Sequence, residues 1–115
     1  MAEHVPTDLL EAFLHHLTHE RRLSAQTLIG YRRDLTRMRG WLESGGCGSW
    51  ERLDQGRVRG YVAWRHRRGA SGKTLQRELS ALRSLYRYLL REGVVDQNPA
   101  QGVRAPKSAR KLPAT

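Results

Sequence analysis

The stretch that decides the fold is KTLQRELSALRSLYRYLLREG, residues 73–93. Its apolar side chains recur every three or four positions, which is the period of a helix with one buried face. These apolar residues are Leu75, Leu79, Leu82, Leu85, Tyr86 and Leu89. We predict a helix that is capped by Ser71 and closed by Gly93.

The opposite face of this helix is basic at both ends and small in the middle. A rotation of about 100° per residue brings into line Lys73, Arg77, Ser80, Ser84, Arg87 and Arg91, with Thr74 and Ala81 beside them. Small side chains would let the helix axis approach a DNA duplex, while guanidinium and hydroxyl groups bind phosphates or base edges. For any single arginine, a solvated helix face is the simpler interpretation.

Three further helices are expected earlier in the chain. The first is capped by Thr7 or Asp8 and runs to His19, the second runs from Ser24 to the glycines at 45–48, and the third runs from Asp54 to Gly69. Their inward residues are Leu9, Leu10, Phe13, Leu14 and Leu17; Leu28, Tyr31, Leu35, Met38 and Leu42; and Val58, Tyr61, Val62 and Trp64. No segment alternates with the period of two that a strand requires, so the prediction is an all-α fold.

The second helix has a polar face of the same kind as the fourth. This face carries Gln26, Thr27, Gly30, Arg33 and Arg37. Gly30 and Gly40 each cost about 1 kcal/mol relative to alanine inside a helix, so we expect this helix to bend or to be less stable than its apolar stripe suggests. In the fourth helix, Glu78 falls at the edge of the apolar stripe, and we expect it to pair with an arginine from a neighbouring helix.

The composition favours a polyanionic partner. The 115 residues suit one domain, and 21 Lys+Arg against 11 Asp+Glu give a net charge of +10 and a pI near 11.0. Only three cationic residues are lysines, and arginine offers planar donors that suit phosphate and guanine. A high genomic GC content explains the arginine bias equally well.

The sequence carries no pattern typical of an active site, a metal site or a membrane segment. Cys47 has no partner thiol, and His15 and His19 lie one turn apart without a third ligand in register. The tyrosines Tyr31 and Tyr86 sit on apolar stripes, which indicates packing rather than catalysis. We therefore expect no cofactor, no metal and no membrane contact, and a soluble cytoplasmic protein.

Three segments together resemble the N-terminal core-binding domain of the bacterial tyrosine recombinases of the phage integrase family. They are LSAQTLIGYRRDLTRMRGWL at 23–42, GKTLQRELSALRSLYRYLLREG at 72–93 and NPAQGVRAPKSARKLP at 98–113. The last segment is more similar to the XerC group than to its partner group, XerD. The resemblance implies an orthogonal four-helix, SAM-like bundle that grips one recombination half-site, and it places the catalytic residues in a C-terminal domain.

The resemblance also implies which residues contact DNA. The second and fourth helices are expected to cross the major groove, through Thr27, Gly30, Arg33, Lys73, Thr74, Arg77, Ser80, Ala81 and Ser84. Helical spacing, rather than the resemblance, adds Arg37, Arg87 and Arg91, which are assigned to phosphates at the rim or to solvent. Glu78 departs from the family's basic or neutral residue at its position.

The domain organisation expected from this resemblance has three parts. Residues 1–5 form a flexible N-terminus, residues 6–102 the core-binding domain, and residues 103–115 an interdomain linker. The linker follows the DNA backbone through Arg104, Lys107, Arg110 and Lys111. The chain ends at LPAT, about where the catalytic domain of the family begins, so we expect a fragment or an isolated domain.

The function implied is DNA binding by a XerC-like recombinase in the resolution of chromosome dimers. Its expected partners are duplex DNA, a XerD-like recombinase and a division-linked DNA translocase, and the first helix, with Leu10 and Leu14 partly outside its stripe, is a candidate for subunit contacts. Three alternatives remain from the sequence: a helix-turn-helix regulator, an RNA-binding helical protein and a purely structural bundle.

Overall fold

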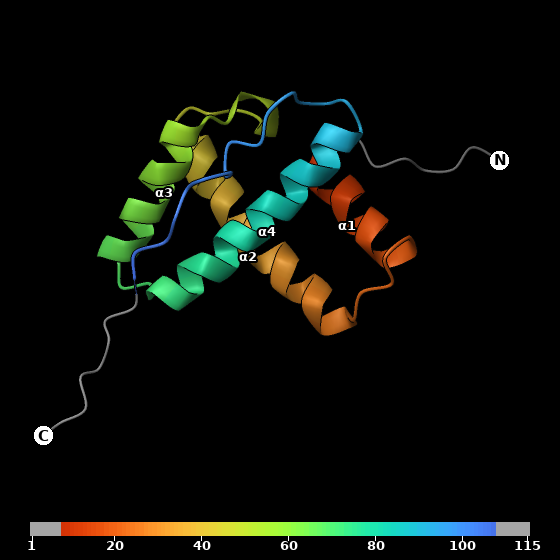
Figure 1. Cartoon of the computed structure of the whole chain (residues 1–115), viewed down its shortest axis with the longest axis horizontal. Helices are drawn as coiled ribbons and strands as arrows, with labels where there is room; N and C mark the ends of the chain where they lie inside the picture. Colours follow the sequence, from red (N-terminus) through yellow and green to blue (C-terminus); the bar gives the residue numbers. More distant parts are fainter. Residues whose placement is uncertain (1–7, 108–115) are drawn as a thin grey trace, which may run out of the picture.

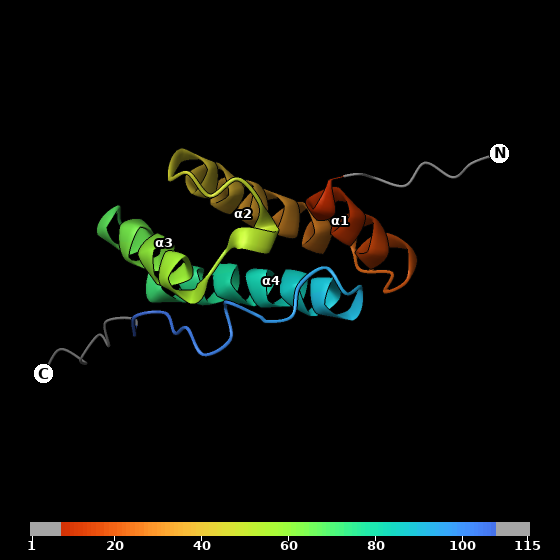
Figure 2. The same ribbon diagram turned by 90° about the horizontal axis from the view of Figure 1, so that it is seen from above.

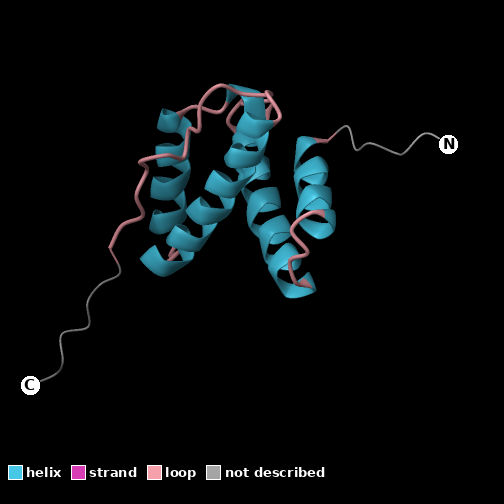
Figure 3. Cartoon of the chain, turned by 45° about the vertical axis from the view of Figure 1, so that its right-hand side comes forward, coloured by secondary structure: helices cyan, strands magenta, loops and turns pink. Residues whose placement is uncertain are grey.

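The computed structural model describes residues 8–107, and this part of the chain folds into helices joined by loops. The helices are α1 (Leu9–His19), α2 (Ala25–Ser44), α3 (Gln55–Arg67) and α4 (Gly72–Arg91), with a short 3-10 turn η1 (Trp50–Arg52) before α3. Figure 3 shows no strand among the described residues. The all-α prediction is confirmed, and η1 is an element that the apolar periodicity did not predict.

Each α-helix begins at a side-chain cap that the sequence contains. The Asp8 carboxylate accepts hydrogen bonds from two backbone N–H groups of α1, and Ser24, Asp54 and Ser71 each accept one at the start of α2, α3 and α4. These bonds satisfy donors that a helix leaves unpaired in its first turn. Of the two caps proposed for α1, Asp8 is the one observed, and Thr7 lies outside the described residues.

The core forms where α4 packs against the three other helices, and α4 crosses in front of α2 in Figure 1. The apolar stripe predicted for α4 is buried in full, with Leu75, Leu82, Leu85 and Leu89 at 0% exposure. The prediction that Leu10 and Leu14 lie partly outside the stripe of α1 is wrong. Because α1 packs against both α2 and α4, these residues are 1% and 4% exposed and offer no surface to another subunit.

Glycines in α2 and α3 have different roles. α2 runs uninterrupted through Gly30 and Gly40, and a Cβ at Gly40 would meet nothing within 4 Å. At Gly60 of α3, a Cβ would lie 3.3 Å from Trp41 Cη2. Gly60 therefore permits α3 to pack closely against the Trp41 ring of α2.

The chain after α4 turns back and packs along this helix. The Arg83 guanidinium donates hydrogen bonds to the carbonyl oxygens of Ala100 and Val103, at 3.2 and 2.5 Å, and Val103 is 2% exposed. Figure 2 shows this segment on the side of α4 opposite to α2. The first residues of the predicted linker thus lie against the domain, while the boundary at residue 103 remains a prediction. Residues 1–5, Arg110 and Lys111 lie outside the described part.

Candidate nucleic-acid interface

The crossing of α2 and α4 creates a groove on the molecular surface. Its volume is about 360 Å³. Its lining residues are Gln26, Thr27, Gly30, Tyr31, Arg33 and Asp34 from α2, and Arg77, Ser80 and Ala81 from α4. The fold therefore brings together six residues that the sequence assigned to a DNA surface from two separate segments. Ala81 is only 4% exposed, so it forms part of the floor rather than a projecting contact.

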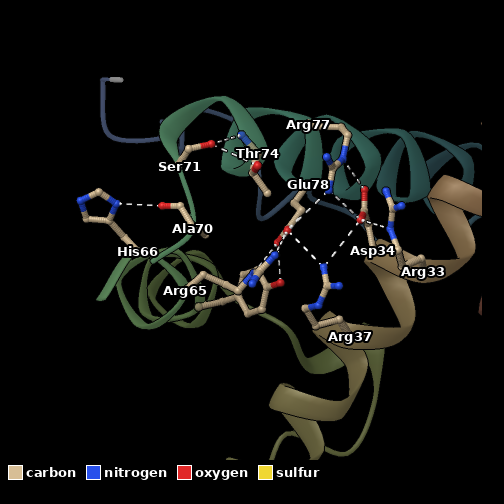
Figure 4. Close-up of polar contacts among 11 residues, drawn as sticks. Arg33, Asp34, Arg37, Arg65, His66, Ala70, Ser71, Thr74, Arg77 and Glu78 are labelled. Carbon is tan, nitrogen blue, oxygen red and sulfur yellow. Dashed lines mark hydrogen bonds and ion pairs between the residues drawn. The ribbon is translucent and has the colours of Figure 1, made fainter. Parts of the chain in front are cut away.

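The buried carboxylate of Asp34 links α2 to α4 at this groove. Asp34 is 2% exposed and accepts hydrogen bonds from Arg77 Nε at 3.0 Å and Arg77 Nη2 at 3.1 Å. Arg33 Nε donates a third bond at 3.3 Å, and Arg37 Nη1 lies 3.8 Å away. Figure 4 shows these arginines converging on Asp34. Sequence periodicity alone did not indicate this carboxylate.

A second buried carboxylate, Glu78, lies beside Asp34 and links α4 to α3. It is 0% exposed and accepts hydrogen bonds from Tyr61 Oη at 2.5 Å and from Arg65 Nε and Nη2 at 3.2 and 2.5 Å. Arg37 Nη1 of α2 donates another at 3.3 Å. The expectation that Glu78 pairs with an arginine of a neighbouring helix is confirmed. Arg65 itself was missed, although a buried glutamate requires such a partner.

Two arginines of this cluster, Arg65 and Arg77, hold their protons more tightly than an isolated guanidinium. Hydrogen bonds to Asp34 raise the pKa of Arg77 above its usual value, and hydrogen bonds to Glu78 raise the pKa of Arg65. Arg33, Arg37, Arg65 and Arg77 surround only two carboxylates. The cluster is therefore cationic as a whole, with guanidinium groups whose positions are fixed by hydrogen bonds.

Other candidate residues follow the outer face of α4. Lys73 is exposed at its start, and the Thr74 hydroxyl accepts a hydrogen bond from the Ser71 hydroxyl at 3.1 Å. Near its end, the exposed Arg87 donates to the half-buried Ser84 hydroxyl at 2.9 Å. Arg91 contacts His16 and the Tyr88 ring, away from the groove lining. Arg104 and Lys107 are exposed beyond the segment that packs on α4.

The described residues do not assemble the side chains of a catalytic or metal site. Burial raises the pKa values of Tyr61 and Tyr86, and both rings are 1% exposed, so neither hydroxyl is accessible to a phosphodiester. The His15 and His19 rings lie close together, with centroids 4.1 Å apart and planes tilted by 50°, yet between residues 8 and 107 no three His, Cys, Asp or Glu side chains converge as metal ligands. In the same range, no helix has both the length and the apolar character needed to cross a membrane.

Residues 10–93 match the family described as "Phage integrase, N-terminal SAM-like domain". The chain belongs to this family. The match covers α1 through α4 and therefore includes both walls of the groove. No solved structure matches the chain significantly.

Curated relatives of the chain include several proteins named Tyrosine recombinase XerC. Identity is 52% to that of Pseudomonas aeruginosa, 50% to that of Azotobacter vinelandii and 49% to that of Xanthomonas campestris pv. campestris. The alignments cover 92%, 92% and 90% of this chain, and 35%, 36% and 32% of the relatives. The chain thus spans about a third of the length of the curated relatives it matches.

Proposed function

We propose that this domain binds duplex DNA for a XerC-type site-specific tyrosine recombinase, gripping one recombination half-site with α2 and α4. The observation that carries this proposal is the groove shared by these helices, which is lined by two arginines hydrogen-bonded to Asp34 and by small residues. A B-DNA major groove admits helices, and its phosphates attract a rim of this charge. The family membership and the XerC relatives support the same proposal.

The residues lining the groove have separable roles in this proposal. The helix axes can approach the duplex because three residues in the groove have small side chains that do not project, namely Gly30, Ser80 and Ala81. Thr27 and Arg33 of α2 face DNA beside Arg77 of α4. Lys73, Thr74, Ser84 and Arg87 contact the phosphate backbone along α4, and Arg37, which is 35% exposed, contributes at the rim.

The segment after α4 continues the DNA contact in this proposal. Arg83 holds residues 100–103 against the domain, so Arg104 and Lys107 leave it from a fixed point. We assign these two residues, together with Arg110 and Lys111, to phosphates along the duplex. The charge of +10 supplies a long-range attraction that steers the domain toward DNA.

The recombination reaction belongs to the whole protein. Its strand cleavage would use residues outside this chain, and this domain contributes binding and orientation without a cofactor. We further propose that the reaction takes place in the cytoplasm, in the resolution of chromosome dimers, with a XerD-like recombinase and a DNA translocase as partners, as the sequence resemblance implies. A helix-turn-helix regulator or an RNA-binding protein would need other partners, and no comparison favours either.

The deciding experiment measures affinity for a XerC-type half-site duplex, a scrambled duplex and a structured RNA across a salt series. We expect the half-site to bind most tightly, with log affinity falling by about 0.9 per log unit of salt for each phosphate contact. Equal binding to all three ligands would reject half-site recognition. Preference for RNA would favour the RNA-binding alternative, and no salt-dependent binding would reject nucleic-acid binding altogether.

A further inference from the structure

We propose that Arg77 reads a guanine base in the major groove and that Asp34 is the positioning residue that orients it. This inference rests on the proposed function, because it assigns base specificity within the same groove. Arg77 projects from α4 and its side chain is 50% exposed, while its carboxylate partner on α2 is 2% exposed. The arginine is therefore anchored at one edge and accessible at another.

The hydrogen bonds of Arg77 leave a specific set of donors free. Nε and Nη2 both donate to Asp34, which occupies the side edge of the planar guanidinium. Nη1 has no hydrogen-bond partner among the described residues, and Glu78 Oε2 lies 3.9 Å from Nη2, beyond hydrogen-bond range. Nη1 and the second hydrogen of Nη2 form the end edge, which presents two parallel donors. Guanine presents two adjacent acceptors, O6 and N7, in the major groove.

The charge of the Arg77–Asp34 pair favours a base over a phosphate. A phosphate is bound mainly through net positive charge, and the adjacent carboxylate offsets much of the charge on Arg77. A guanine edge is neutral, so what it requires is correct direction of the donors, which the two bonds to Asp34 supply. Arg87, ten positions later on α4, hydrogen-bonds within residues 8–107 only to the neutral Ser84 hydroxyl, and no carboxylate offsets its charge there. Arg87 is thus the expected phosphate contact and Arg77 the base contact.

The surroundings of Arg77 allow such a contact to form. Ser80 and Ala81 follow it on α4, and Gly30 lies across the groove on α2. None of these side chains is long enough to keep a base edge away from the free edge of the guanidinium. Arg33 also donates to Asp34, but through one bond at 3.3 Å, so its orientation is less restricted than that of Arg77.

The first experiment selects bound sequences from a duplex library with a randomised core, using the full chain and three variants. Wild type is expected to enrich guanine at one position, and Arg77→Ala to lose that preference alone. Arg87→Ala should keep the preference, and so should Arg57→Ala, which removes an exposed arginine paired with Asp54 at the start of α3. Retention of the guanine preference in Arg77→Ala would overturn the inference.

The second experiment measures affinity for the selected duplex across a salt series. Arg77→Ala should weaken binding about 5- to 150-fold, the range of one bidentate base contact, without changing the salt slope. Replacing the selected guanine by 7-deazaguanine, which lacks the N7 acceptor, should weaken wild type and leave Arg77→Ala unaffected. Arg87→Ala should lower the salt slope by about 0.9. A drop of that size in Arg77→Ala would show a phosphate contact and overturn the inference.

Asp34→Asn tests the positioning role, since it keeps the shape of the side chain and removes its charge. We expect it to reduce the guanine preference although Arg77 is present, with thermal unfolding confirming that the variant is folded. An unchanged preference in the folded variant would overturn the role of Asp34. If the variant fails to fold, Arg77→Lys, which loses the fork of donors, tests whether directed donors are needed. Loss of the guanine preference in Arg77→Lys would support the inference, and an unchanged preference would overturn it.

The failure of this inference can be told apart from that of the proposed function. Wild type that binds every duplex with equal, salt-sensitive affinity overturns guanine reading and leaves DNA binding intact. Wild type that binds no duplex rejects both.

Discussion

Asp34 and Glu78 are both buried carboxylates, yet the side chains that donate hydrogen bonds to them differ in their exposure to solvent. Around Asp34, the side chains of Arg33 and Arg77 are 53% and 50% exposed, so the carboxylate presents them to solvent. Around Glu78, Arg65 is 20% exposed and Tyr61 is 1% exposed, so the same kind of charge is enclosed between helices. Arg37 contacts both carboxylates.

The difference shows that a buried carboxylate can either hold arginine side chains at the surface or join helices in the core. Removing a carboxylate from water is costly, and both sites offset that cost with several hydrogen bonds. At Glu78 the donors come from α2 and α3, so these bonds join three helices, including α4. At Asp34 the donors are Arg33 and Arg77, which line the groove, so the hydrogen bonds that offset the burial cost also fix the direction of two exposed guanidiniums.

The largest expected effect on stability comes from removing the carboxylate of Glu78, which is enclosed between helices. Glu78→Ala should lower the free energy of unfolding by about 3–5 kcal/mol, because it leaves Arg65 and Tyr61 without their buried partner. Urea denaturation measures this change. Glu92→Ala, at the exposed end of the same helix, is the control and should change stability by less than about 0.5 kcal/mol. Similar losses in the two variants would remove the proposed role of Glu78 in cohesion.

A smaller effect is expected from removing one donor to Glu78. Tyr61→Phe should lower stability by about 1.5–3 kcal/mol, the range for a hydrogen bond to a charged group. Tyr88→Phe is the matched control, because the Tyr88 hydroxyl makes no hydrogen bond within the described residues. Equal stability of the two variants in urea denaturation would contradict the prediction.

Tyr61 also makes the stability contributed by the Glu78 site depend on pH. Burial, and then the hydrogen bond to Glu78, raises the pKa of Tyr61 above its usual 10.0. The folded state therefore holds this proton more tightly, and the associated stability is present below pH 10.0 and lost as pH rises further. We expect the stability gap between wild type and Tyr61→Phe to narrow above that pH, and a constant gap would contradict this.

Two glycines of α2 allow a test of whether DNA approaches the groove beside Asp34. Gly30→Ala and Gly40→Ala should each stabilise the fold by about 1 kcal/mol, since a Cβ at Gly30 finds its nearest atom, Arg33 Nη2, at 3.9 Å. Only Gly30 lines the groove, so only Gly30→Ala should weaken half-site binding. Equal affinities in a titration, with both proteins stabilised, would show that DNA does not approach this part of α2.

The smallest expected effect concerns a carboxylate that is partly exposed to solvent. Asp8 is 42% exposed and pairs with Arg39 at 2.7 Å. Asp8→Asn keeps an N-cap and should cost about 0.2–1 kcal/mol at neutral pH, the range for an exposed ion pair. Asp96→Asn, an exposed acid outside the helices, is the control.

Acid titration tests the Asp8–Arg39 pair further. Burial acts to raise the pKa of Asp8, but hydrogen bonds from Arg39 and from the first turn of α1 outweigh it and lower the pKa below 3.8. The pair's contribution is present above that pH and lost as pH falls through the lower, folded value. The difference between wild type and Asp8→Asn should vanish there, and a persistent difference would contradict the assignment.

Several features of the fold were predictable because they depend on neighbours in the sequence. Apolar spacing predicted the four helices, and Ser24, Asp54 and Ser71 predicted where three of them begin, because a cap bonds to N–H groups two or three residues away. The turn η1 was not predicted, because a segment of three residues is too short to show a helical period. Leu10 and Leu14 were misplaced because the width of a buried stripe depends on how many helices pack against it.

The candidate site was predictable in outline and not in detail. Helical spacing found Arg33, Arg37 and Arg77 on outward faces, but it treated each as an independent cation. Arg77 meets Asp34 across 43 positions of sequence, and Arg65 meets Glu78 from another helix. Periodicity cannot report such contacts, because it describes the faces of a helix and not the helix that lies opposite.

The sequence by itself determined four helices, their caps, a cationic chain and a small-residue face on both α2 and α4, because these properties arise from local spacing and composition. Only the tertiary structure decided that the two faces line one groove, that buried Asp34 holds Arg33 and Arg77 there, and that buried Glu78 joins the helices beside it. The physical reason is that a buried charge must find its partners within hydrogen-bond distance, and packing of the helices sets which side chains those are.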